Sequence, residues 1–324
     1  MFFTLEPTKS AQNKYNKKTQ KAYDWLRTIP WELFGIVKND GIDQQEIINL
    51  QNAIGVLADG LVGLGTLKAL QKVLKVRFQL LWNPISGEIS EVSSSSLESN
   101  HILWKGLEVP LPQVESCTIY TYRDPQGLNL HEVGSFNKRS RTINSAIVHW
   151  GGLNPQHLAR VFSNRKASSH FAVGRSEDSG EVGIYQYLDV AHIAWHAVGA
   201  NTNSIGIDIC QQPEVKHLGY YANRQYDVQT IDNPAAPHYG PPKVISLDSQ
   251  IKTATVELLR GLEVAFSIPK CIPPTSQHQI DKDLLAQGGI FSHFHVDFKN
   301  QRKWDVAPWW DSIREEFESK ALRT

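Results

Sequence analysis

Histidine is the residue type in this chain that most clearly points to chemistry. Of the 12 histidines, ten lie between His149 and His295, and an imidazole can bind a metal ion or transfer a proton. A catalytic zinc site needs about three nitrogen or oxygen ligands from the protein and one open position. His149, His295 and Asp305 can supply two imidazoles and one carboxylate. They come from separate segments, so a site forms only if the fold brings those segments together.

The elements that must position these residues follow from the hydrophobic pattern of the second half. Residues 143–150 (INSAIVHW) form a β-branched run that predicts a buried strand ending at His149. Pro155 fits the first turn of a helix over residues 155–164, and residues 247–268 predict a longer amphipathic helix. Further strands are expected at residues 169–174, 184–188 and 203–210. Strands with interspersed helices predict an α/β or α+β domain.

The first half has a different pattern. Apolar residues recur at helical spacing from about residue 16 to residue 78, around a glycine-rich turn. Residues 81–100 are polar and rich in serine, which predicts a linker, and strand patterns resume from residue 101 onward. Within the second half, residues 211–246 are aromatic and proline-rich, and we expect them to form a loop insertion over the site.

Composition excludes several classes of protein. Lys+Arg and Asp+Glu both number 33, without a basic stripe, which argues against a nucleic-acid partner. The three cysteines are too few for a disulfide scaffold, and no pair has the spacing of a thiolate zinc finger. No apolar run reaches the roughly 18 residues of a membrane span. We therefore expect a soluble protein without a membrane span, most simply a monomer.

The glycine-rich segment of the first half resembles the peptidoglycan-binding repeat of bacterial wall enzymes. That pattern combines a helix with Leu-Gln, an Asp-Gly turn, a glycine-and-threonine turn and a second helix. The matching positions here are Leu50, Gln51, Asp59, Gly60, Gly63 and Thr66. The resemblance implies a small all-α peptidoglycan-binding domain over residues 1–80.

The second half resembles the zinc-dependent N-acetylmuramoyl-L-alanine amidases, a superfamily that includes the peptidoglycan-recognition proteins. Four blocks carry the resemblance in the order of that family: IVHW, SSHFAV with IYQYL, AWHA with NSIGIDI, and HVDFKNQRKWDVAP. The resemblance covers residues 143–310. It implies a catalytic domain over residues 101–324 with a mixed central sheet flanked by helices, and one zinc ion per chain.

The resemblance also assigns roles to individual residues. It implies His149, His295 and Asp305 as zinc ligands, and His293 is the alternative to His295. His295 is favoured because its ten-residue step to Asp305, with Lys303 between them, matches the family. Asp208 and Lys303 correspond to catalytic positions, a proton acceptor and a cation beside the scissile carbonyl. Trp195, His196 and Asn203 are the expected substrate-binding residues.

Two departures from the family pattern bear on these roles. Asp208 stands where the cytosolic branch has a glutamate, so its carboxylate is one methylene shorter, and a purely structural role for this strand-end residue is the alternative. After Asp305 the sequence is Val-Ala-Pro instead of Pro-Gly-Pro, which changes the following loop but keeps the ligand.

The function implied is hydrolysis of the amide between the muramic acid lactyl group and L-Ala of the stem peptide. The alternatives are a non-catalytic peptidoglycan-recognition protein and a cytosolic amidase that recycles muropeptides. The first 18 residues place apolar side chains before lysines, the reverse of a secretory signal peptide. We therefore expect synthesis in the cytoplasm and non-classical delivery to the cell wall. Phage lysis, as for an endolysin, is one route. Contractile secretion of an antibacterial effector, with an immunity protein or a delivery partner, is the other.

Overall fold

The computed structural model describes residues 29–34, 36, 44–56, 58–78, 80–83, 85, 89–91, 100–130, 136–137, 141–236, 240–298 and 303–321. The N-terminal residues that bear on delivery lie outside these ranges. The chain divides into two compact units, residues 1–99 with 106–110, and residues 100–105 with 111–324. Among the described helices, none is both long and apolar enough to cross a bilayer.

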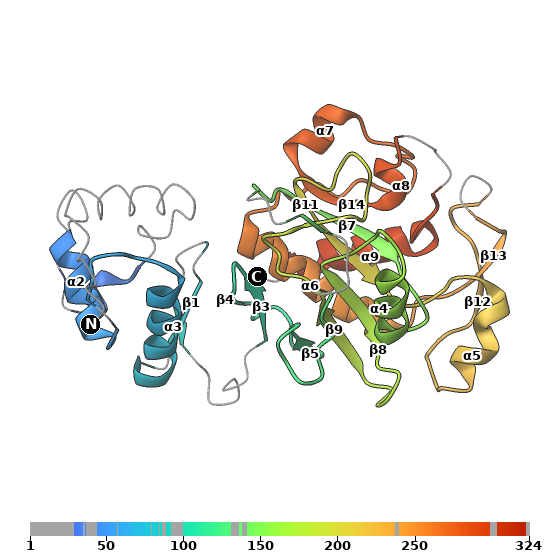
Figure 1. Cartoon of the computed structure of the whole chain (residues 1–324). Helices are drawn as coiled ribbons and strands as arrows, with labels where there is room; N and C mark the ends of the chain where they lie inside the picture. Colours follow the sequence, from blue (N-terminus) through green and yellow to red (C-terminus); the bar gives the residue numbers. More distant parts are fainter. Residues whose placement is uncertain are drawn as a thin grey trace. The chain divides into compact units, whose positions relative to one another are not determined.

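A six-stranded mixed sheet forms the centre of the larger unit (Figure 1). Its strands, in spatial order, are β14 (Gly289–Ser292), β7 (Ser145–Trp150), β11 (Ser204–Ile209), β8 (Phe171–Arg175), β9 (Val182–Gln186) and β5 (Thr118–Tyr120). The first four run parallel to one another, β9 is antiparallel to β8, and β5 is parallel to β9. The expected α/β domain with a mixed central sheet is confirmed.

Helices cover both faces of this sheet, which explains why its central strands are continuously apolar. All six residues of β11 and the first five of β7 are buried. Helix α4 (Pro155–Ser163) contacts β8, α6 (Ser249–Phe266) contacts β8 and β9, and α9 (Ala307–Ala321) packs on α6. The shorter α7 (Lys282–Gln287) directly precedes β14, and α8 (His293–Val296) follows it and contacts β14 and β7. Asn154 caps α4 through its side chain, and Asp248 caps α6.

The insertion after β11 is more ordered than the loop predicted from its composition. It contains η3 (Val215–His217), α5 (Leu218–Ala222) and the antiparallel pair β12 (Thr230–Asp232) and β13 (Lys243–Ile245). Short strands β3 (His101–Trp104), β10 (Ile193–Ala194) and β6 (Phe136–Asn137) complete the described strands of this unit, and β10 pairs with β6.

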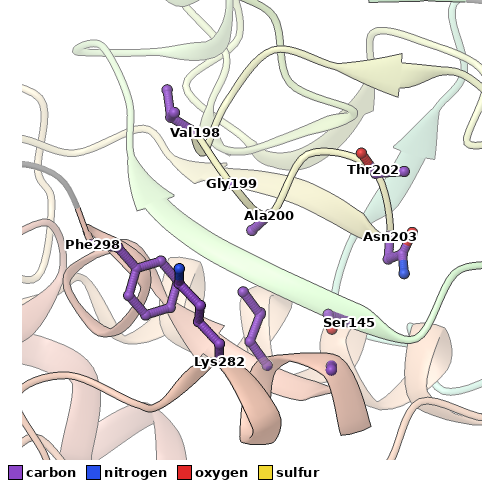
Figure 2. Close-up of a pocket in the computed structure, with 10 residues that line it drawn as sticks. Ser145, Val198, Gly199, Ala200, Thr202, Asn203, Lys282 and Phe298 are labelled. Atoms are coloured by element: carbon purple, nitrogen blue, oxygen red, sulfur yellow. The ribbon is translucent and has the colours of Figure 1, made fainter.

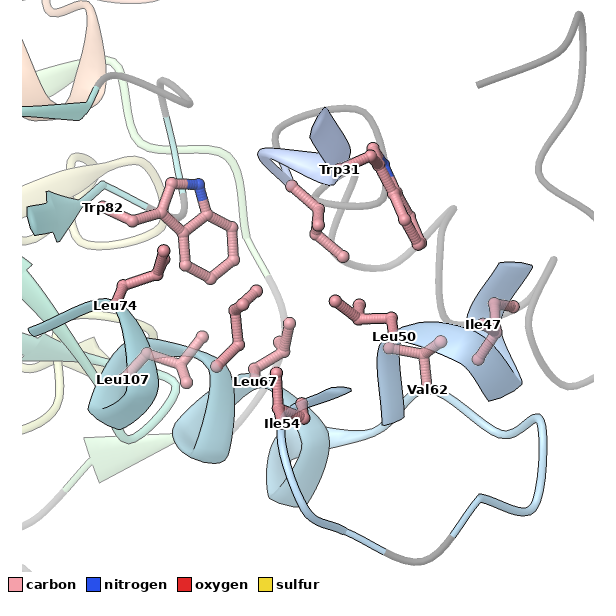
Figure 3. Packing of buried hydrophobic residues seen from close by; sticks show 11 residues of the cluster. Trp31, Ile47, Leu50, Ile54, Val62, Leu67, Leu74, Trp82 and Leu107 are labelled. Carbon is pink, nitrogen blue, oxygen red and sulfur yellow. The ribbon is translucent and has the colours of Figure 1, made fainter. Parts of the chain in front are cut away.

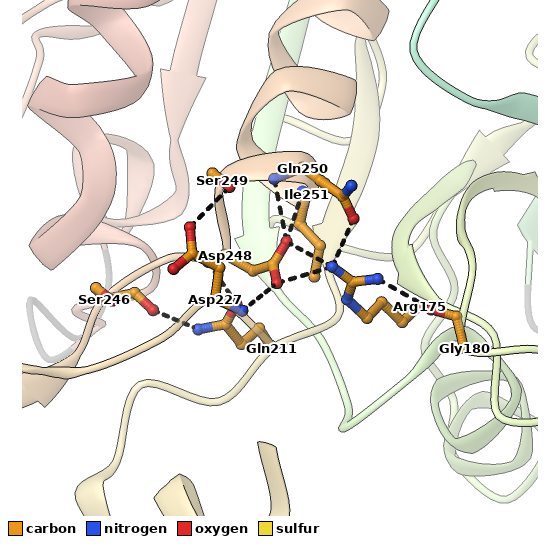
Figure 4. A network of polar contacts seen from close by, with 9 residues as sticks. All are labelled: Arg175, Gly180, Gln211, Asp227, Ser246, Asp248, Ser249, Gln250 and Ile251. Atoms are coloured by element: carbon orange, nitrogen blue, oxygen red, sulfur yellow. Dashed lines mark hydrogen bonds and ion pairs between the residues drawn. The ribbon is translucent and has the colours of Figure 1, made fainter. Parts of the chain in front are cut away.

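A buried carboxylate ties the insertion to the sheet and to α6 (Figure 4). Asp248 accepts hydrogen bonds from the backbone N–H groups of Gln250 and Asp227 and pairs with Arg175 at 3.0 Å. The Gln211 side chain joins the two ends of the insertion, because it accepts from the Asp248 N–H and donates to the Ser246 carbonyl. Every polar atom of this carboxylate therefore has a structural partner.

The smaller unit has its own apolar core (Figure 3). Its described elements are η2 (Trp31–Phe34), α2 (Gln44–Ala53), α3 (Leu64–Phe78), β1 (Leu80–Trp82), β2 (Ile89–Glu91) and β4 (Leu107–Pro110). Strands β1 and β2 pair antiparallel within the stretch predicted as a linker, and Trp82 is buried in the core. The unit is therefore not all-α, and its structure extends beyond residue 80.

The repeat-like residues of this unit hold its turn together. The Gln51 amide is buried, donates to Asp59 Oδ1 at 2.9 Å and to the Leu61 carbonyl at 3.0 Å, and accepts from the Gly60 N–H at 2.9 Å. Gly60 has φ +70°, a conformation that favours glycine. Leu50 and Thr66 are also buried. The repeat-like sequence pattern is therefore explained by the hydrogen bonds and burial that this turn needs in order to fold.

Candidate metal centre

Three ionisable side chains meet at the carboxyl end of the central strands. His149 is the fifth residue of β7, His293 directly follows β14, and Asp305 precedes α9. The Nδ1 atoms of His149 and His293 lie 3.0 Å apart, and Asp305 Oδ2 lies 2.9 Å from His293 Nδ1 and 3.7 Å from His149 Nδ1. Two imidazoles and a carboxylate therefore converge on one point from segments about 150 residues apart in sequence.

This geometry fits a zinc ion. Ligand atoms at 2.0–2.1 Å from a tetrahedral zinc lie roughly 3.3 Å from one another. The three distances between donor atoms bracket that value. Two imidazoles and one carboxylate are also a donor set of catalytic zinc sites, which leave a fourth position open. His149, His293 and Asp305 are the group in the described part of the chain that could hold a metal ion.

Burial and charge set the protonation of these groups. Burial alone would raise the pKa of Asp305, but the close imidazoles of His293 and His149 outweigh it and hold that pKa well below its usual range. Burial, with a smaller contribution from the neighbouring His293, lowers the pKa of His149 to about 4 against the opposing effect of Asp305. An ionised carboxylate beside a neutral imidazole is the state in which both bind a metal.

The structure does not bring His295 into this group, contrary to the expectation from the ten-residue step to Asp305. The Nδ1 atom of His295 accepts from the Ser292 N–H at 3.1 Å, and Nε2 lies 3.2 Å from the Pro274 carbonyl. Both ring nitrogens are thus used to hold the start of α8. Residues two apart on a helix are about 200° apart around its axis, so only one of the two histidines can face the site.

The strand register contains the signal that identifies His293. Ser292 of β14 is the register partner of Val148 in the parallel strand β7. One residue further along both strands places His293 beside His149. Side chains that follow the carboxyl ends of neighbouring parallel strands gather at one edge of a sheet. Recognising the strand end at Ser292 would therefore have selected His293 from sequence.

A groove of about 400 Å³ lies over the three ligand atoms and extends along α4. Of the sequence-predicted residues, Trp195, His196, Asp208 and Lys303 line it together with His149 and Asp305. Trp195 is 46% exposed, so an aromatic surface is available to a ligand at the rim. Leu158 and Phe162 of α4 supply an apolar wall, and Arg165 supplies a cation at its end.

Asp208 lies next to the ligand group. It is the register partner of His149 on the adjacent parallel strand, and its side chain is buried. Burial, against the opposing effect of the nearby Ser169 hydroxyl and with a smaller contribution from the charge of Asp305, raises the pKa of Asp208 to about 8. A carboxyl group so placed can hold or release a proton near neutral pH, whereas an ordinary surface aspartate cannot.

The segment that carries Asp305 is fixed on both sides. Trp304 packs edge-on against Trp150 with ring centroids 4.2 Å apart. A Cβ at Gly240 of the insertion would lie 2.4 Å from the Trp304 ring, so glycine permits this close approach. Lys303 remains exposed, and its backbone N–H donates to Asp297 at 3.2 Å. Asp305 is thereby anchored, while the neighbouring Lys303 side chain is exposed.

Asn203 lies away from this site. It precedes β11, whereas Asp208 is the fifth residue of that strand, and five residues of strand span roughly 17 Å. Asn203 instead lines a second cavity of about 640 Å³ at the amino ends of β7 and β11 (Figure 2). Val198, Lys282 and Phe298 also line that cavity. The expected role of Asn203 in substrate binding at the metal centre is therefore not supported.

Part of this chain matches a known protein family. Residues 121–236 match the family model of N-acetylmuramoyl-L-alanine amidase. The match includes His149, His196 and Asp208 and ends before His293 and Asp305. It confirms the resemblance of this part of the chain to the amidases. No curated protein matches the chain significantly.

Solved structures with similarity to this chain carry amidase and endolysin titles. One is an endolysin N-acetylmuramoyl-L-alanine amidase from Clostridium intestinale, with 13% identity over 63% of this chain and 98% of its own, and a TM-score of 0.35. Another is a mutant endolysin from Bacillus subtilis, with 18% identity, 62% and 99% coverage and a TM-score of 0.35. The catalytic domain of PlyG has 13% identity, 62% and 93% coverage and a TM-score of 0.37.

Proposed function

We propose that this chain, whose residues 121–236 match the N-acetylmuramoyl-L-alanine amidase family, cleaves the amide between the muramic acid lactyl group and L-Ala in peptidoglycan. The observation that carries the proposal is the convergence of His149 Nδ1, His293 Nδ1 and Asp305 Oδ2 within 3.7 Å at the floor of an open groove. We assign these three side chains as ligands of one zinc ion. When bound, zinc supplies a Lewis acid and lowers the pKa of a water molecule toward 7.

The residues around the ligands have complementary tasks in this proposal. Asp208 accepts the proton of the attacking water and returns it to the leaving amine of L-Ala. The exposed Lys303 ammonium stabilises the negative charge that develops on the carbonyl oxygen of the substrate. Trp195 offers a flat surface at the rim, which suits the apolar face of a sugar or the lactyl group.

We further propose that the smaller unit binds peptidoglycan and keeps the enzyme on its substrate. The support for this role is the repeat-like sequence pattern of residues 50–66. Leu50, Gln51 and Thr66 are buried, so they would act by supporting the turn that Asp59, Gly60 and Gly63 form. Direct contacts to the glycan would then come from exposed residues around that turn. The site of action in this proposal is the cell wall, and delivery follows one of the two non-classical routes.

Product analysis tests the proposed reaction. Full-length protein is incubated with purified sacculi, and the released material is identified by mass spectrometry. We expect stem peptides with a free L-Ala amine and no new reducing sugar ends. A metal chelator and the His149→Ala substitution should each abolish release, and added zinc should restore only the chelated wild type.

Other outcomes would contradict the proposal in distinguishable ways. New reducing ends would indicate cleavage of the glycan. Binding to sacculi without release would indicate a recognition protein. Activity on small soluble muropeptides but not on sacculi would favour a recycling enzyme. Zinc analysis of the purified protein complements this test, with about one ion per chain expected.

A further inference from the structure

His196 and Ser204 form a chain of hydrogen bonds that ends at the proposed ligand His149. Ser204 Oγ lies 2.6 Å from the Ala200 carbonyl and 3.1 Å from His196 Nε2. His196 Nδ1 in turn lies 3.0 Å from His149 Nε2. The first residue of β11 is thus connected, through one imidazole, to the ring of a ligand at the far end of β7.

The direction of each hydrogen bond follows from the chemistry of the groups. A carbonyl only accepts, so the single hydroxyl proton of Ser204 must point to Ala200. The Ser204 oxygen can then only accept from His196, which requires a proton on His196 Nε2. A neutral imidazole carries one proton, so His196 Nδ1 is an acceptor and His149 Nε2 must be the donor.

We propose that His196 and Ser204 are positioning residues that hold His149 as its Nε2–H tautomer. The unprotonated Nδ1 of His149 then faces His293 and Asp305, with its lone pair directed at the metal position. This inference rests on the proposed ligation by His149 and assigns His196 a role different from contact with substrate. Partners of this kind orient ligand imidazoles and typically change metal affinity by about 10- to 100-fold.

Neighbouring residues hold His196 in the position from which it contacts His149. A Cβ at Gly206 would lie 2.7 Å from His196 Cγ, so only glycine lets the ring lie against β11. The backbone N–H groups of His196 and Ala197 both donate to Asn201 Oδ1, at 3.0 and 2.7 Å. Ring and backbone of His196 are therefore both held in place.

Nitrogen NMR of the metal-free, full-length protein tests the relay. In the wild type we expect a protonated Nε2 and an unprotonated Nδ1 for His149. Ser204→Ala removes the acceptor that fixes His196, so His149 should populate both tautomers and zinc should bind about 10-fold more weakly. Ser145→Ala is the matched control, because Ser145 is equally buried and is the register partner of Ser204 on β7.

A second pair of variants separates positioning from packing. His196→Ala removes the acceptor for His149, whereas His196→Asn places an amide oxygen near the position of Nδ1. Zinc affinity, measured by chelator competition, should fall in His196→Ala and recover toward the wild type in His196→Asn. Wild-type His149 protonated on Nδ1, or unchanged tautomer populations in Ser204→Ala, would overturn the proposal. Neither readout depends on product release, so the amidase proposal is tested separately.

Discussion

The two ends of the central sheet carry cavities of opposite character. The smaller one, about 400 Å³, lies at the carboxyl ends of β7 and β11 and is lined by four histidines, two aspartates, a lysine and an arginine. The larger one, about 640 Å³, lies at the amino ends and is lined mainly by apolar groups such as Val198, Leu285 and Phe298, with Lys282 as its cation. The larger cavity and the cluster of ionisable side chains therefore lie at opposite ends of the same strands.

This difference follows from the topology of a parallel sheet. The carboxyl ends of β14, β7 and β11 are adjacent although the strands are far apart in sequence, so loops that leave them can each contribute one side chain. At the amino ends, the segments that lead into the strands are held by backbone hydrogen bonds. There the Asn203 carbonyl accepts from the Asn144 and Ser145 N–H groups. The comparison predicts that substitutions at the carboxyl end change the reaction and that those at the amino end do not.

The largest contrast is expected between the two neighbouring histidines of α8. His293→Ala removes a proposed ligand, so bound zinc and activity should both be lost. His295→Ala should retain zinc and destabilise the fold by roughly 1–3 kcal/mol, because the Ser292 N–H and the Pro274 carbonyl lose their partner. Zinc content and thermal unfolding check both variants. Loss of zinc in His295→Ala with full zinc in His293→Ala would reverse the assignment.

Asp208→Asn should have the next largest effect. The amide cannot carry the proton from water to the leaving amine, so kcat should fall by about 10²- to 10⁴-fold. Because Asp208 is not a proposed ligand, zinc content should stay near one per chain. Steady-state kinetics on a defined muropeptide measures the change, and Asp208→Glu tests whether a longer carboxyl is tolerated at this buried position. An unchanged kcat in Asp208→Asn would leave Asp208 with a structural role only.

Lys303→Ala should reduce kcat by about 10- to 100-fold, less than the roughly 10²- to 10³-fold typical for loss of one oxyanion donor, because this ammonium is exposed. Lys303→Arg keeps the positive charge and should recover part of the rate. The same muropeptide assay at two salt concentrations separates a local contact from general attraction. Equal rates for the alanine and arginine variants would show that the charge is not used.

The smallest effect is expected at the opposite end of the sheet. Asn203→Ala keeps the backbone carbonyl that holds Asn144 and Ser145, so the free energy of unfolding should change by less than about 0.5 kcal/mol. Its kcat/KM should match that of the wild type. A marked loss of activity would connect the apolar cavity to the reaction and weaken the contrast between the two ends.

The central sheet was predictable because its strands are buried on both faces. The continuous apolar runs around Ile147 and Ile207 have no other stable arrangement in a domain of this size, and Asp248 and Pro155 mark helix starts by well-defined capping chemistry. The insertion was less predictable. Its proline and aromatic content indicated a loop, but Gln211 and Asp248 stabilise short elements through contacts that are distant in sequence.

The candidate metal centre was predictable in the types of its side chains and only partly in which residues supply them. His149 and Asp305 follow from sequence, whereas the choice between His293 and His295 depends on where β14 ends and α8 begins. The number of residues between two positions does not by itself show on which side of a helix each side chain lies. The predicted role of Asn203 failed for a related reason. Asn203 is close to Asp208 in sequence, but the extended strand β11 places the two residues at its opposite ends.

The hydrogen bond between Gln211 and Asp248 has a consequence for how this chain could be re-engineered. Gln211 and Asp248 join the two ends of the insertion by a hydrogen bond of 2.9 Å, so the segment between them begins and ends at one point of the scaffold. Replacing it with a segment of another length costs little closure entropy, because that cost grows only slowly with length. Gln212 belongs to this segment and lines the groove, so exchange of the segment would alter one wall of the groove. Gly240, which lies against Trp304, also belongs to this segment. An exchange that keeps the glycine against Trp304 should therefore change this wall of the groove while Asp305 stays anchored.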